Sequence, residues 1–478
     1  MTPVKIAFWG FLLVVFAIYY LPVVRKRVAI QNLWLLFASV VFYGLADLRM
    51  LPLLVVSILL FYILGNGVSN SVCRKDWARA SLLEALGIVC GVAVLAWFKC
   101  AGLFTSRHPI VPIGISFYTF RLMSYVIELK RGKIEKCSSI VDFALYVSFF
   151  PTLLSGPIDR PGKFIPQLSK VRDFDYGMAV DGCRQILWGL FLKLCVADNL
   201  STVTDNVWNG IAATPSSVLW VVFLFYPLQL YADFCGYSDI AIGVGKLLGI
   251  RVARNFNHPF LARNVAEYWR NWHISLTKWL TDYVFTPLSV RFRNLGNAGT
   301  CLSIIITFVL IGLWHGIDWT YGLFGLYHGI LFIPLILSGS FNRKKKLQEN
   351  RFGLPRASDF IRMCGVWLLV AFGLILFRAP SLHEAAAFCS GMAAMPDGGL
   401  MGLVFALKDA GARLVSPLFL LLVLLLEWKC RKQEYPLQFS AGSRPAVSII
   451  CRTAVYVALA CAIIICQGGH ESFVYFQF

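Results

Sequence analysis

Residues 299–342 read GTCLSIIITFVLIGLWHGIDWTYGLFGLYHGILFIPLILSGSFN, and this stretch decides the fold. Its only formally charged side chain is Asp318, yet it carries two histidines, His315 and His328. An apolar run of this length suits a membrane, which a helix crosses with about 20 residues. A titratable ring inside such a run is costly and is by default a functional candidate. Because histidine exchanges a proton near neutral pH, the sequence predicts proton chemistry inside the membrane.

The rest of the chain has the same apolar character. It is 58% hydrophobic and 14% charged over 478 residues, whereas a soluble domain carries about 25% charged residues. We therefore expect an all-α polytopic membrane protein that forms one integral-membrane domain over residues 1–478. Roughly ten to twelve segments should cross or re-enter the membrane, near residues 6–24, 28–46, 50–68, 81–98, 139–156, 178–196, 215–233, 300–314, 319–338, 361–377, 414–427 and 447–466.

The net charge of +19 does not indicate nucleic-acid binding, because the basic residues sit in short hydrophilic connectors. The positive-inside rule places these connectors in the cytoplasm and the N-terminus outside. Residues 1–22 are predicted to be a retained first span, because the apolar run is long and no small-residue cleavage site precedes Arg25. We expect a multi-pass protein of the inner (cytoplasmic) membrane. The basic connectors are residues 25–27, 74–75, 343–346 and 429–432.

The common signatures of soluble enzymes and metal sites are missing from the sequence. Fourteen cysteines are scattered without a C-x-x-C pair, so neither a disulfide framework nor a cysteine metal site is expected. The sequence contains no G-x-S-x-G elbow, no H-E-x-x-H motif and no P-loop, which argues against a serine hydrolase, a zinc protease or a nucleotide-triphosphate enzyme of those types. No metal and no tightly bound cofactor is predicted.

Three regions interrupt the apolar rhythm. In residues 111–132, Pro112 and Gly114 predict a bent or re-entrant segment. In residues 150–170, repeated proline and glycine rule out one straight helix, and irregular backbone at membrane depth survives only when it is buried in protein or faces water. The third region, residues 231–290, includes Glu267–Val284, whose tryptophans recur at helical spacing. That pattern predicts an amphipathic helix at the membrane interface.

Histidine is the residue type best suited to chemistry here. Glycines on both sides of His315 let another backbone or a substrate approach closely, and Trp314 shapes a slot beside the ring. A structural histidine that bridges two helices is the alternative for His315 and for His273, and for His328 the structural interpretation is the favoured one. Asp318 either orients the His315 ring or caps the following helix, and the cap is the favoured interpretation.

Two acids lie beside an apolar span, in the run Tyr231–Asp239. Asp233 and Asp239 either hold basic partners such as Arg270 or line a polar cavity. Pairing with a basic residue is the favoured interpretation.

Several segments together resemble one family over nearly the whole chain. They are PIGISFYTF (112–120), FFPTLLSGPIDRP (149–161), LFLKLCVADNL (190–200), QLYADFCGYSDIAIG (229–243), FNHPFLARNVAEYWRNWHISLTKWLTDYVFTPL (256–288), IGLWHGIDWTYGLFGLYHG (311–329) and FVYFQF (473–478). The chain is similar to the bacterial membrane-bound O-acyltransferases. Within them it is similar in particular to alginate O-acetyltransferase membrane subunits and, more distantly, to the D-alanyl transferases of teichoic acids.

The resemblance implies a ring of tilted helices around a central funnel or tunnel. The family core would cover residues 110–340, with peripheral helices in residues 1–100 and 360–478. It implies that His315 is the catalytic histidine and His273 a second functional one, and it places Trp272, Trp314 and Asp239 near the centre. The run GPIDR (156–160) is more similar to the D-alanyl branch of the family, whereas GYSD (236–239) and the chain length are more similar to the acetyl branch.

The predicted reaction moves an acyl group, with acetyl favoured, from a cytoplasmic thioester to a hydroxyl of an extracytoplasmic polysaccharide or to a partner protein that completes the transfer. The donor would be acetyl-CoA or a phosphopantetheine carrier, and an extracytoplasmic acyl-handling partner is expected. His315 would remove the hydroxyl proton, and His273 would orient the thioester or relay the proton. Arg270 and Lys278 would bind donor phosphates. The alternatives are D-alanyl transfer to teichoic acid and a polysaccharide transporter.

Overall fold

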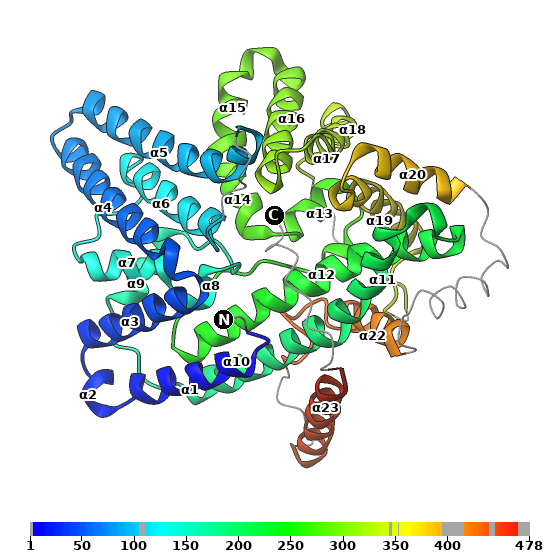
Figure 1. Cartoon of the computed structure of the whole chain (residues 1–478), viewed down its shortest axis with the longest axis horizontal. Helices are drawn as coiled ribbons and strands as arrows, with labels where there is room; N and C mark the ends of the chain where they lie inside the picture. The colour runs from blue at the N-terminus through cyan, green and yellow to red at the C-terminus, as the bar shows by residue number, and fades with distance from the viewer. Residues whose placement is uncertain are drawn as a thin grey trace. The chain divides into compact units, whose positions relative to one another are not determined.

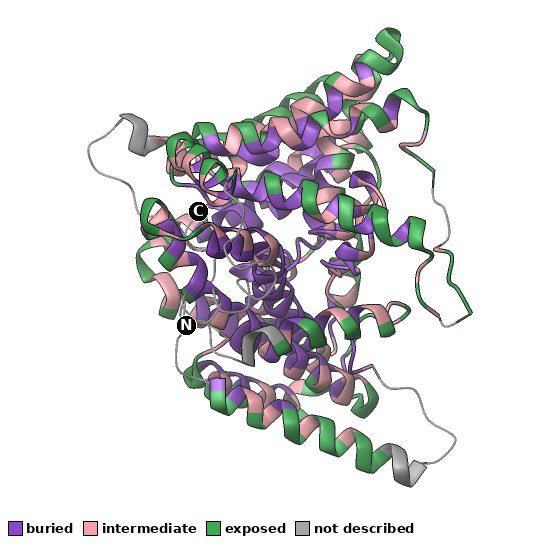
Figure 2. Cartoon of the chain, turned by 90° about the vertical axis from the view of Figure 1, so that its right-hand side faces the viewer, coloured by how far each residue is buried: buried purple, intermediate pink, exposed green. Residues whose placement is uncertain are grey.

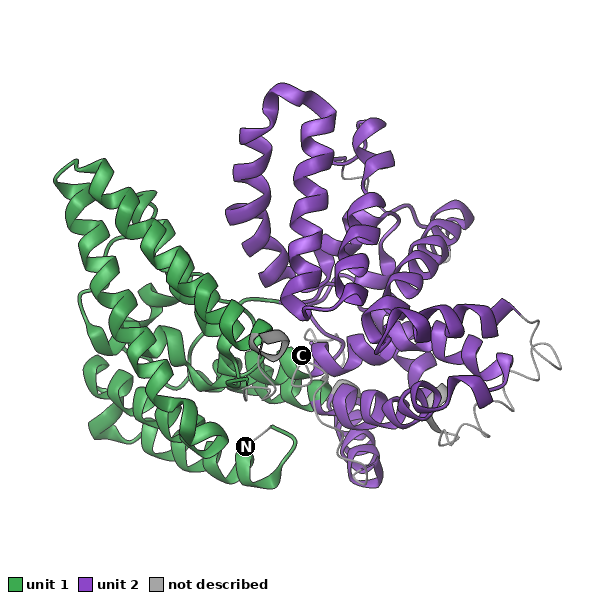
Figure 3. Cartoon of the chain, turned by 45° about the horizontal axis from the view of Figure 1, so that its top comes forward, with its two compact units in different colours: residues 1–189, 237–254 green, residues 190–236, 255–478 purple. Residues whose placement is uncertain are grey.

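The computed structural model describes residues 3–104, 111–343, 347–351, 353–393, 415–438 and 445–466. This described part consists of helices and short connections, with no β-strand in it, so the all-α prediction is confirmed. The chain divides into two compact units, one made of residues 1–189 and 237–254 and the other of residues 190–236 and 255–478 (Figure 3). The expectation of a single integral domain stays a prediction. Residues 344–346 of one basic cluster and the tail 473–478 lie outside the described residues.

The first unit begins with the N-terminal helices and is completed by the end of α12 (Figure 1). Its helices are α1 (Ile6–Tyr19), α2 (Pro22–Arg25), α3 (Val28–Asp47), η1 (Leu48–Met50), α4 (Leu51–Cys73), α5 (Trp77–Phe104), α6 (Ile115–Lys130), α7 (Ile140–Ser148), α8 (Phe150–Leu153), α9 (Pro161–Leu168) and α10 (Tyr176–Leu190). The long helix α12 (Ser216–Leu247) continues from the second unit into the first.

The second unit holds all four histidines of the resembling segments, which include both histidines of the stretch 299–342. Its helices are η2 (Phe191–Ala197), α11 (Asp198–Asn209), η3 (Ile211–Ala213), η4 (Pro259–Leu261), α13 (Val265–Asn271), α14 (Ile274–Leu280), η5 (Thr281–Phe285), α15 (Thr286–Arg291), η6 (Arg293–Leu295), α16 (Gly296–His315), α17 (Trp319–Ile330), α18 (Ile333–Leu337), α19 (Ala357–Arg378), α20 (Leu382–Ala393), α22 (Val415–Lys429) and α23 (Pro445–Cys466).

Three histidines that matter below, His273, His315 and His328, all belong to this second unit. Within the described residues, eight helical stretches are long and apolar enough to cross a membrane, and the multi-pass prediction is confirmed. One of them, Val28–Cys73, covers the two predicted spans 28–46 and 50–68. The others are Trp77–Cys100, Tyr176–Asn209, Ser216–Leu247, Arg293–His315, Trp319–Leu337, Ala357–Arg378 and Ile449–Cys466.

The predicted span at residues 139–156 is wrong as a single helix. α7 ends at Ser148, and Phe149 adopts an extended conformation with φ −52° and ψ 108° before α8 begins. Pro151 lies in the first turn of α8, where its missing N–H and fixed φ are tolerated, but it could not continue the preceding helix. The segment therefore consists of two short helices joined at a bend.

The long helices differ in how much of their apolar surface the protein covers. Only 11% of the apolar window of Trp77–Cys100 is buried, whereas 83% of the window of α12 is buried (Figure 2). Exposed leucine, valine and isoleucine side chains on a long helix are expected where lipid replaces water as the solvent. α12 is instead a core helix, packed on all sides by protein.

A fully buried arginine explains how the first unit accommodates its irregular backbone. Arg121, on α6, donates hydrogen bonds to the carbonyl oxygens of Tyr146 and Val147 at 3.2 Å each and of Pro157 at 3.0 Å. It also donates to the carbonyl oxygen and the hydroxyl of Thr152, at 3.2 and 2.6 Å. The predicted break in residues 150–170 is confirmed, and its carbonyls find their partners inside the protein, as backbone at membrane depth requires.

The predicted bend near Gly114 is also confirmed. Gly114 has φ +74° and directly precedes α6. A Cβ at this position would lie 2.3 Å from the carbonyl oxygen of Leu153, so both the backbone conformation and the close approach favour glycine.

Candidate active site

The hairpin of α16 and α17 positions His315. α16 ends at His315, and the side chain of Asp318 caps α17 by accepting a hydrogen bond from the backbone N–H of Thr320 at 3.3 Å. The capping role favoured for Asp318 is therefore confirmed. A Cβ on Gly312 would lie 2.0 Å from the carbonyl oxygen of Tyr321, so the glycine before His315 admits the backbone of α17.

The segment Glu267–Val284 does not form the single interfacial helix that its pattern predicts. α13 ends at Asn271 and α14 begins at Ile274, with His273 between them in the left-handed conformation at φ +43°. The tryptophans at 269, 272 and 279 are buried and do not act as surface anchors. The cause is Asn255, whose backbone carbonyl accepts from Ile274 N–H at 2.8 Å and whose side chain accepts from Ser275 N–H at 3.3 Å.

Asn255 also fixes the tautomer of His273. Its Oδ1 atom accepts from the N–H and the hydroxyl of Ser275, at 3.3 and 2.9 Å, and lies 3.0 Å from Nδ1 of His273. Because the amide oxygen of asparagine carries no hydrogen and can only accept, Nδ1 of His273 must carry the proton in this contact. The lone pair of the neutral ring is then on Nε2.

His273 is a neutral hydrogen-bonding group at physiological pH. Its side chain is 2% exposed, and burial lowers the pKa of the imidazole to about 3. Holding the ring protonated near pH 7 would therefore cost about 5 kcal/mol. A general base works best with a pKa near the operating pH, so His273 is suited to accept a hydrogen bond and poorly suited to take the proton.

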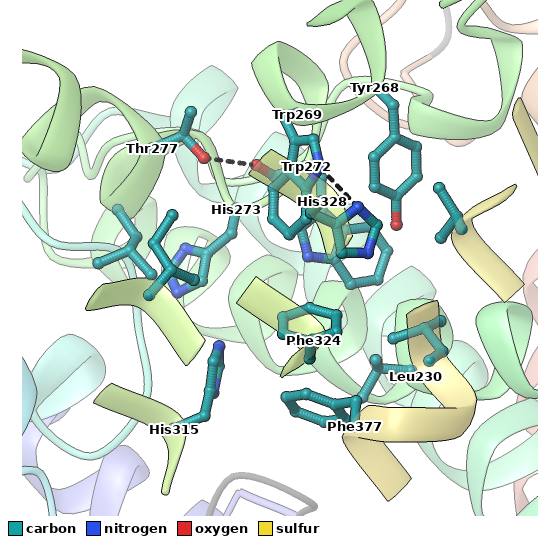
Figure 4. Close-up of a pocket in the computed structure, with 14 residues that line it drawn as sticks. Leu230, Tyr268, Trp269, Trp272, His273, Thr277, His315, Phe324, His328 and Phe377 are labelled. Carbon is teal, nitrogen blue, oxygen red and sulfur yellow. Dashed lines mark hydrogen bonds between the residues drawn. The ribbon is translucent and has the colours of Figure 1, made fainter. Parts of the chain in front are cut away.

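His273 and His315 line the same small cavity, of about 20 Å³ (Figure 4). Figure 4 shows the two imidazoles on one side of it and Phe324 and Phe377 on the other. The ring of Trp314 lies 4.5 Å from that of His315 and 6.4 Å from that of His273, centroid to centroid. The remaining lining residues are Leu230, Tyr268, Trp269, Trp272, Leu276, Thr277, Ile311, His328, Val370 and Leu374.

A larger cavity, of about 700 Å³, adjoins the small one. Three residues line both: Trp269, Thr277 and Ile311. Arg270 and Lys278 line only the larger cavity. Arg270 donates a hydrogen bond to the carbonyl oxygen of Phe341, and Lys278 is exposed. The structure thus places five of the predicted site residues, His315, His273, Trp272, Arg270 and Lys278, on two neighbouring cavities, with Trp314 in ring contact with both histidines.

The two acids in the run Tyr231–Asp239 do not line either cavity. Asp239 belongs to the other unit, where its carboxylate accepts from the amide of Gln185 at 2.7 Å. Asp233 has the expected basic partner, but that partner is Lys193 at 2.7 Å and not Arg270. Lys193 also binds Asp198 at 2.7 Å, which makes a buried ion cluster. In the part of the chain that the structure describes, no group of three or more His, Cys, Asp or Glu side chains is arranged to hold a metal ion.

Sequence reasoning missed Asn255 and left His328 without a role. Asn255 lies 18 residues before His273, outside any helical spacing that would connect the two. His328 follows His315 after a turn and a new helix start, so the helical register that relates residues on one helix does not apply. Only the α16–α17 hairpin brings His315 and His328 to one cavity.

Comparison with known proteins identifies the family. The model of the MBOAT, or membrane-bound O-acyltransferase, family matches residues 95–377. The chain belongs to this family. It is 33% identical to a probable alginate O-acetylase AlgI of Pseudomonas putida over 412 residues, which cover 82% of this chain and 80% of the relative.

Other members of the family differ in the acyl group or acceptor that their names state. The chain is 29% identical to a peptidoglycan O-acetyltransferase of Helicobacter pylori, over 82% of this chain and 79% of that protein. It is 28% identical to a teichoic acid D-alanyltransferase of Bacillus subtilis, over 66% and 83%. The reaction type that these relatives share makes the protein a membrane O-acyltransferase, as the sequence predicts.

Proposed function

We propose that the protein transfers an acetyl group from a cytoplasmic thioester to a hydroxyl of an extracytoplasmic polysaccharide, in the inner (cytoplasmic) membrane. The observation that carries the proposal is the convergence of His315 and His273 on one buried cavity beside a larger one that Arg270 and Lys278 line. Acetyl is favoured because the relatives whose similarity extends over more of this chain are named as acetylating enzymes. A hydroxyl acceptor fits a site whose titratable groups include a histidine.

Basic residues before the start of α16 and after the end of α18 support an opening for the donor on the cytoplasmic side. Arg291 and Arg293 directly precede α16, and Arg343 follows residues Phe341 and Asn342, which line the larger cavity. The positive-inside rule assigns such flanks to the cytoplasm. Ile304, Thr307, Phe308 and Ile311 of α16 line the larger cavity, and the same helix ends at His315. A donor in this cavity would therefore extend along α16 toward the catalytic histidine.

The larger cavity suits a coenzyme A or phosphopantetheine donor. Its volume of about 700 Å³ falls within the usual range of roughly 300 to 1,000 Å³ for small-molecule sites. Apolar walls from α16 would accommodate the linear arm, and Arg270 and Lys278 would bind the phosphates. Guanidinium and phosphate form short charge-assisted hydrogen bonds, and the planar guanidinium keeps several N–H donors beyond the one used by Phe341.

The reaction then needs one base and one oriented nucleophile. His315 removes the proton of the acceptor hydroxyl as its oxygen attacks the thioester carbonyl. The carbon–sulfur bond breaks, the proton passes from His315 to the leaving sulfur, and an ester and a thiol are the products. His315 is the last residue of α16, where the helix dipole stabilises the imidazolium that forms. Nε2 of His273 accepts a hydrogen bond and orients the reacting group.

The acceptor would approach from the turn between α16 and α17. Trp319, four residues after His315, is 78% exposed, and Ile317 and Asp318 are also exposed. This turn lies at the opposite end of α16 from Arg291 and Arg293. An extracytoplasmic polysaccharide, or a partner protein that completes the transfer, would therefore meet His315 from the side away from the donor.

Membrane vesicles that contain the protein test this proposal. With labelled acetyl-CoA supplied on the cytoplasmic face, we expect covalently acetylated product, and mass spectrometry of surface polysaccharide from cells with and without the chain should show the matching acetyl groups. Transfer only from a D-alanyl carrier protein would assign the chain to the other branch of the family. Movement of labelled polysaccharide without covalent transfer would replace the enzyme with a transporter.

A further inference from the structure

Trp269 separates the two cavities of the second unit. It lines both of them, together with Thr277 and Ile311. These three side chains therefore form the boundary between the larger cavity and the one that holds the histidines. Trp269 has the largest side chain of the three, so its orientation has the greatest effect on that boundary.

His328 holds the indole of Trp269 in place. The indole N–H donates a hydrogen bond to Nδ1 of His328 at 3.3 Å, drawn as a dashed line in Figure 4. The two rings meet edge to face with centroids 5.0 Å apart. Phe308 packs against another edge of the indole, also at 5.0 Å. The indole is thus fixed by one hydrogen bond and two perpendicular ring contacts.

The histidine itself has no room to turn. His328 is fully buried, and a Cβ on Gly373 of α19 would lie only 2.4 Å from its Nε2 atom. Because Nδ1 accepts the indole proton, the neutral ring carries its own proton on Nε2. α19 therefore closes one side of the ring and Trp269 the other, which fixes both the rotamer and the tautomer.

His328 lines the same small cavity as His315, and the ring of Phe324 contacts both, 4.8 Å from that of His328 and 6.4 Å from that of His315, centroid to centroid. His328 does not line the larger cavity, so its influence there passes through the residues whose rings it contacts. Trp269 borders both cavities and is hydrogen-bonded to His328.

We propose that His328 is a positioning residue that fixes Trp269 as one edge of an aperture, which admits a linear acyl-thioester arm and keeps water of the larger cavity away from the acyl carbon. The inference rests on the proposed function. Water that passed the aperture would attack the thioester carbonyl, the carbon–sulfur bond would break, and a carboxylic acid and a thiol would form in place of the ester. Exclusion of water from an active site prevents this side reaction.

The ratio of acetate released to acetyl transferred tests the aperture, measured with labelled acetyl-CoA in vesicles that contain the acceptor. His328→Leu removes the hydrogen-bond acceptor, and Trp269→Phe removes the donor while keeping an aromatic wall. We expect each to raise the ratio severalfold, and the double variant to raise it no further, because both break one interaction. His328→Asn keeps an acceptor near the Nδ1 position, so we expect it to restore the ratio toward that of the wild type.

Tyr327→Phe is the matched control, because the Tyr327 hydroxyl ties α17 to α19 by donating to the carbonyl oxygen of Leu369 at 2.9 Å without contacting Trp269. We expect its ratio to equal that of the wild type. The aperture is refuted if folded His328→Leu and Trp269→Phe proteins keep the wild-type ratio, or if the effects of these two variants add. Wild-type protein that transfers no acetyl group from any thioester would refute the proposed function and the aperture together, whereas normal transfer with unchanged ratios refutes the aperture alone.

Discussion

At the scale of single residues, two histidines of one cavity are suited to different tasks. His273 is held by a hydrogen bond to Asn255, in a neutral form with its lone pair on Nε2. His315 ends a helix and contacts the rings of Trp314 and Phe377, at 4.5 and 4.9 Å between centroids. A helix end favours a positive charge, whereas the surroundings of His273 disfavour one. This difference is the reason that we propose proton transfer for His315 and orientation for His273.

Replacing Asn255 with aspartate should change the pH dependence of transfer. A carboxylate at this position still accepts the Nδ1 proton of His273, but it also stabilises the imidazolium, so the pKa of His273 rises above about 3. The Nε2 lone pair is then lost at a higher pH, and we expect the acid limb of the rate profile to move upward. Transfer rates measured from about pH 4 to about pH 8 give the answer.

Ser275→Ala serves as the control for Asn255→Asp, because it removes a hydrogen bond of 2.9 Å to the same oxygen without adding charge. Its profile should keep the wild-type shape. Superimposable profiles for wild type and Asn255→Asp would contradict the role assigned to Asn255.

Burial of His273 also predicts how stability depends on pH. The folded-state pKa is about 3, below the ordinary value of 6.5, so the unfolded chain binds more protons between these values. The stabilising effect is complete above about pH 6.5 and is lost as the pH falls toward about 3. In detergent, the wild type should lose thermal stability on acidification more steeply than His273→Gln, which has no ring to titrate. Equal slopes would show that His273 is not buried in its neutral form.

At the scale of helices, the contact between α16 and α17 fixes the position of His315. A Cβ on Gly325 would lie 2.3 Å from the carbonyl oxygen of Phe308, whereas one on Gly322 of the same helix would meet nothing nearer than 4.0 Å. Gly325→Ala should therefore push the helices apart, at a cost of about 1–3 kcal/mol, and reduce transfer. Unfolding and transfer assays on both variants check this, with Gly322→Ala expected to behave as the wild type. Equal behaviour of the two alanine variants would contradict the close packing.

The positions of helices could be predicted from the sequence where local chemistry determines them. They could not be predicted where a polar side chain far away in the sequence forms hydrogen bonds with the helix backbone. The long apolar stretches, the irregular backbone after Leu153 and the cap at Asp318 all follow from local chemistry. The break at His273 does not, because the periodicity of Glu267–Val284 continues through it. It depends on Asn255, which competes for the backbone N–H groups of the following residues. A sequence pattern carries no sign of such a tertiary contact.

At the scale of the whole molecule, the chain combines lipid-facing helices with a second unit that holds both cavities. The family resemblance predicted His315, His273 and Trp272 at a common centre, and the structure brings these three to one cavity. It also suggested Asp239, which the structure places in the other unit with Gln185. Sequence motifs indicate which residues recur in a family. The pairing of the Asp239 carboxylate with the Gln185 amide depends instead on how α10 and α12 pack, which a motif does not show.

The central claim is that His315 activates an alcohol from within the membrane. The most direct measurement is acyl transfer by purified His315→Ala in vesicles supplied with a labelled thioester and acceptor, alongside circular dichroism to confirm that the helices remain. We predict that the variant is folded and inserted but transfers no acyl group above background, because alanine has no group that can remove the hydroxyl proton. Transfer at the wild-type rate by the folded variant would contradict the account.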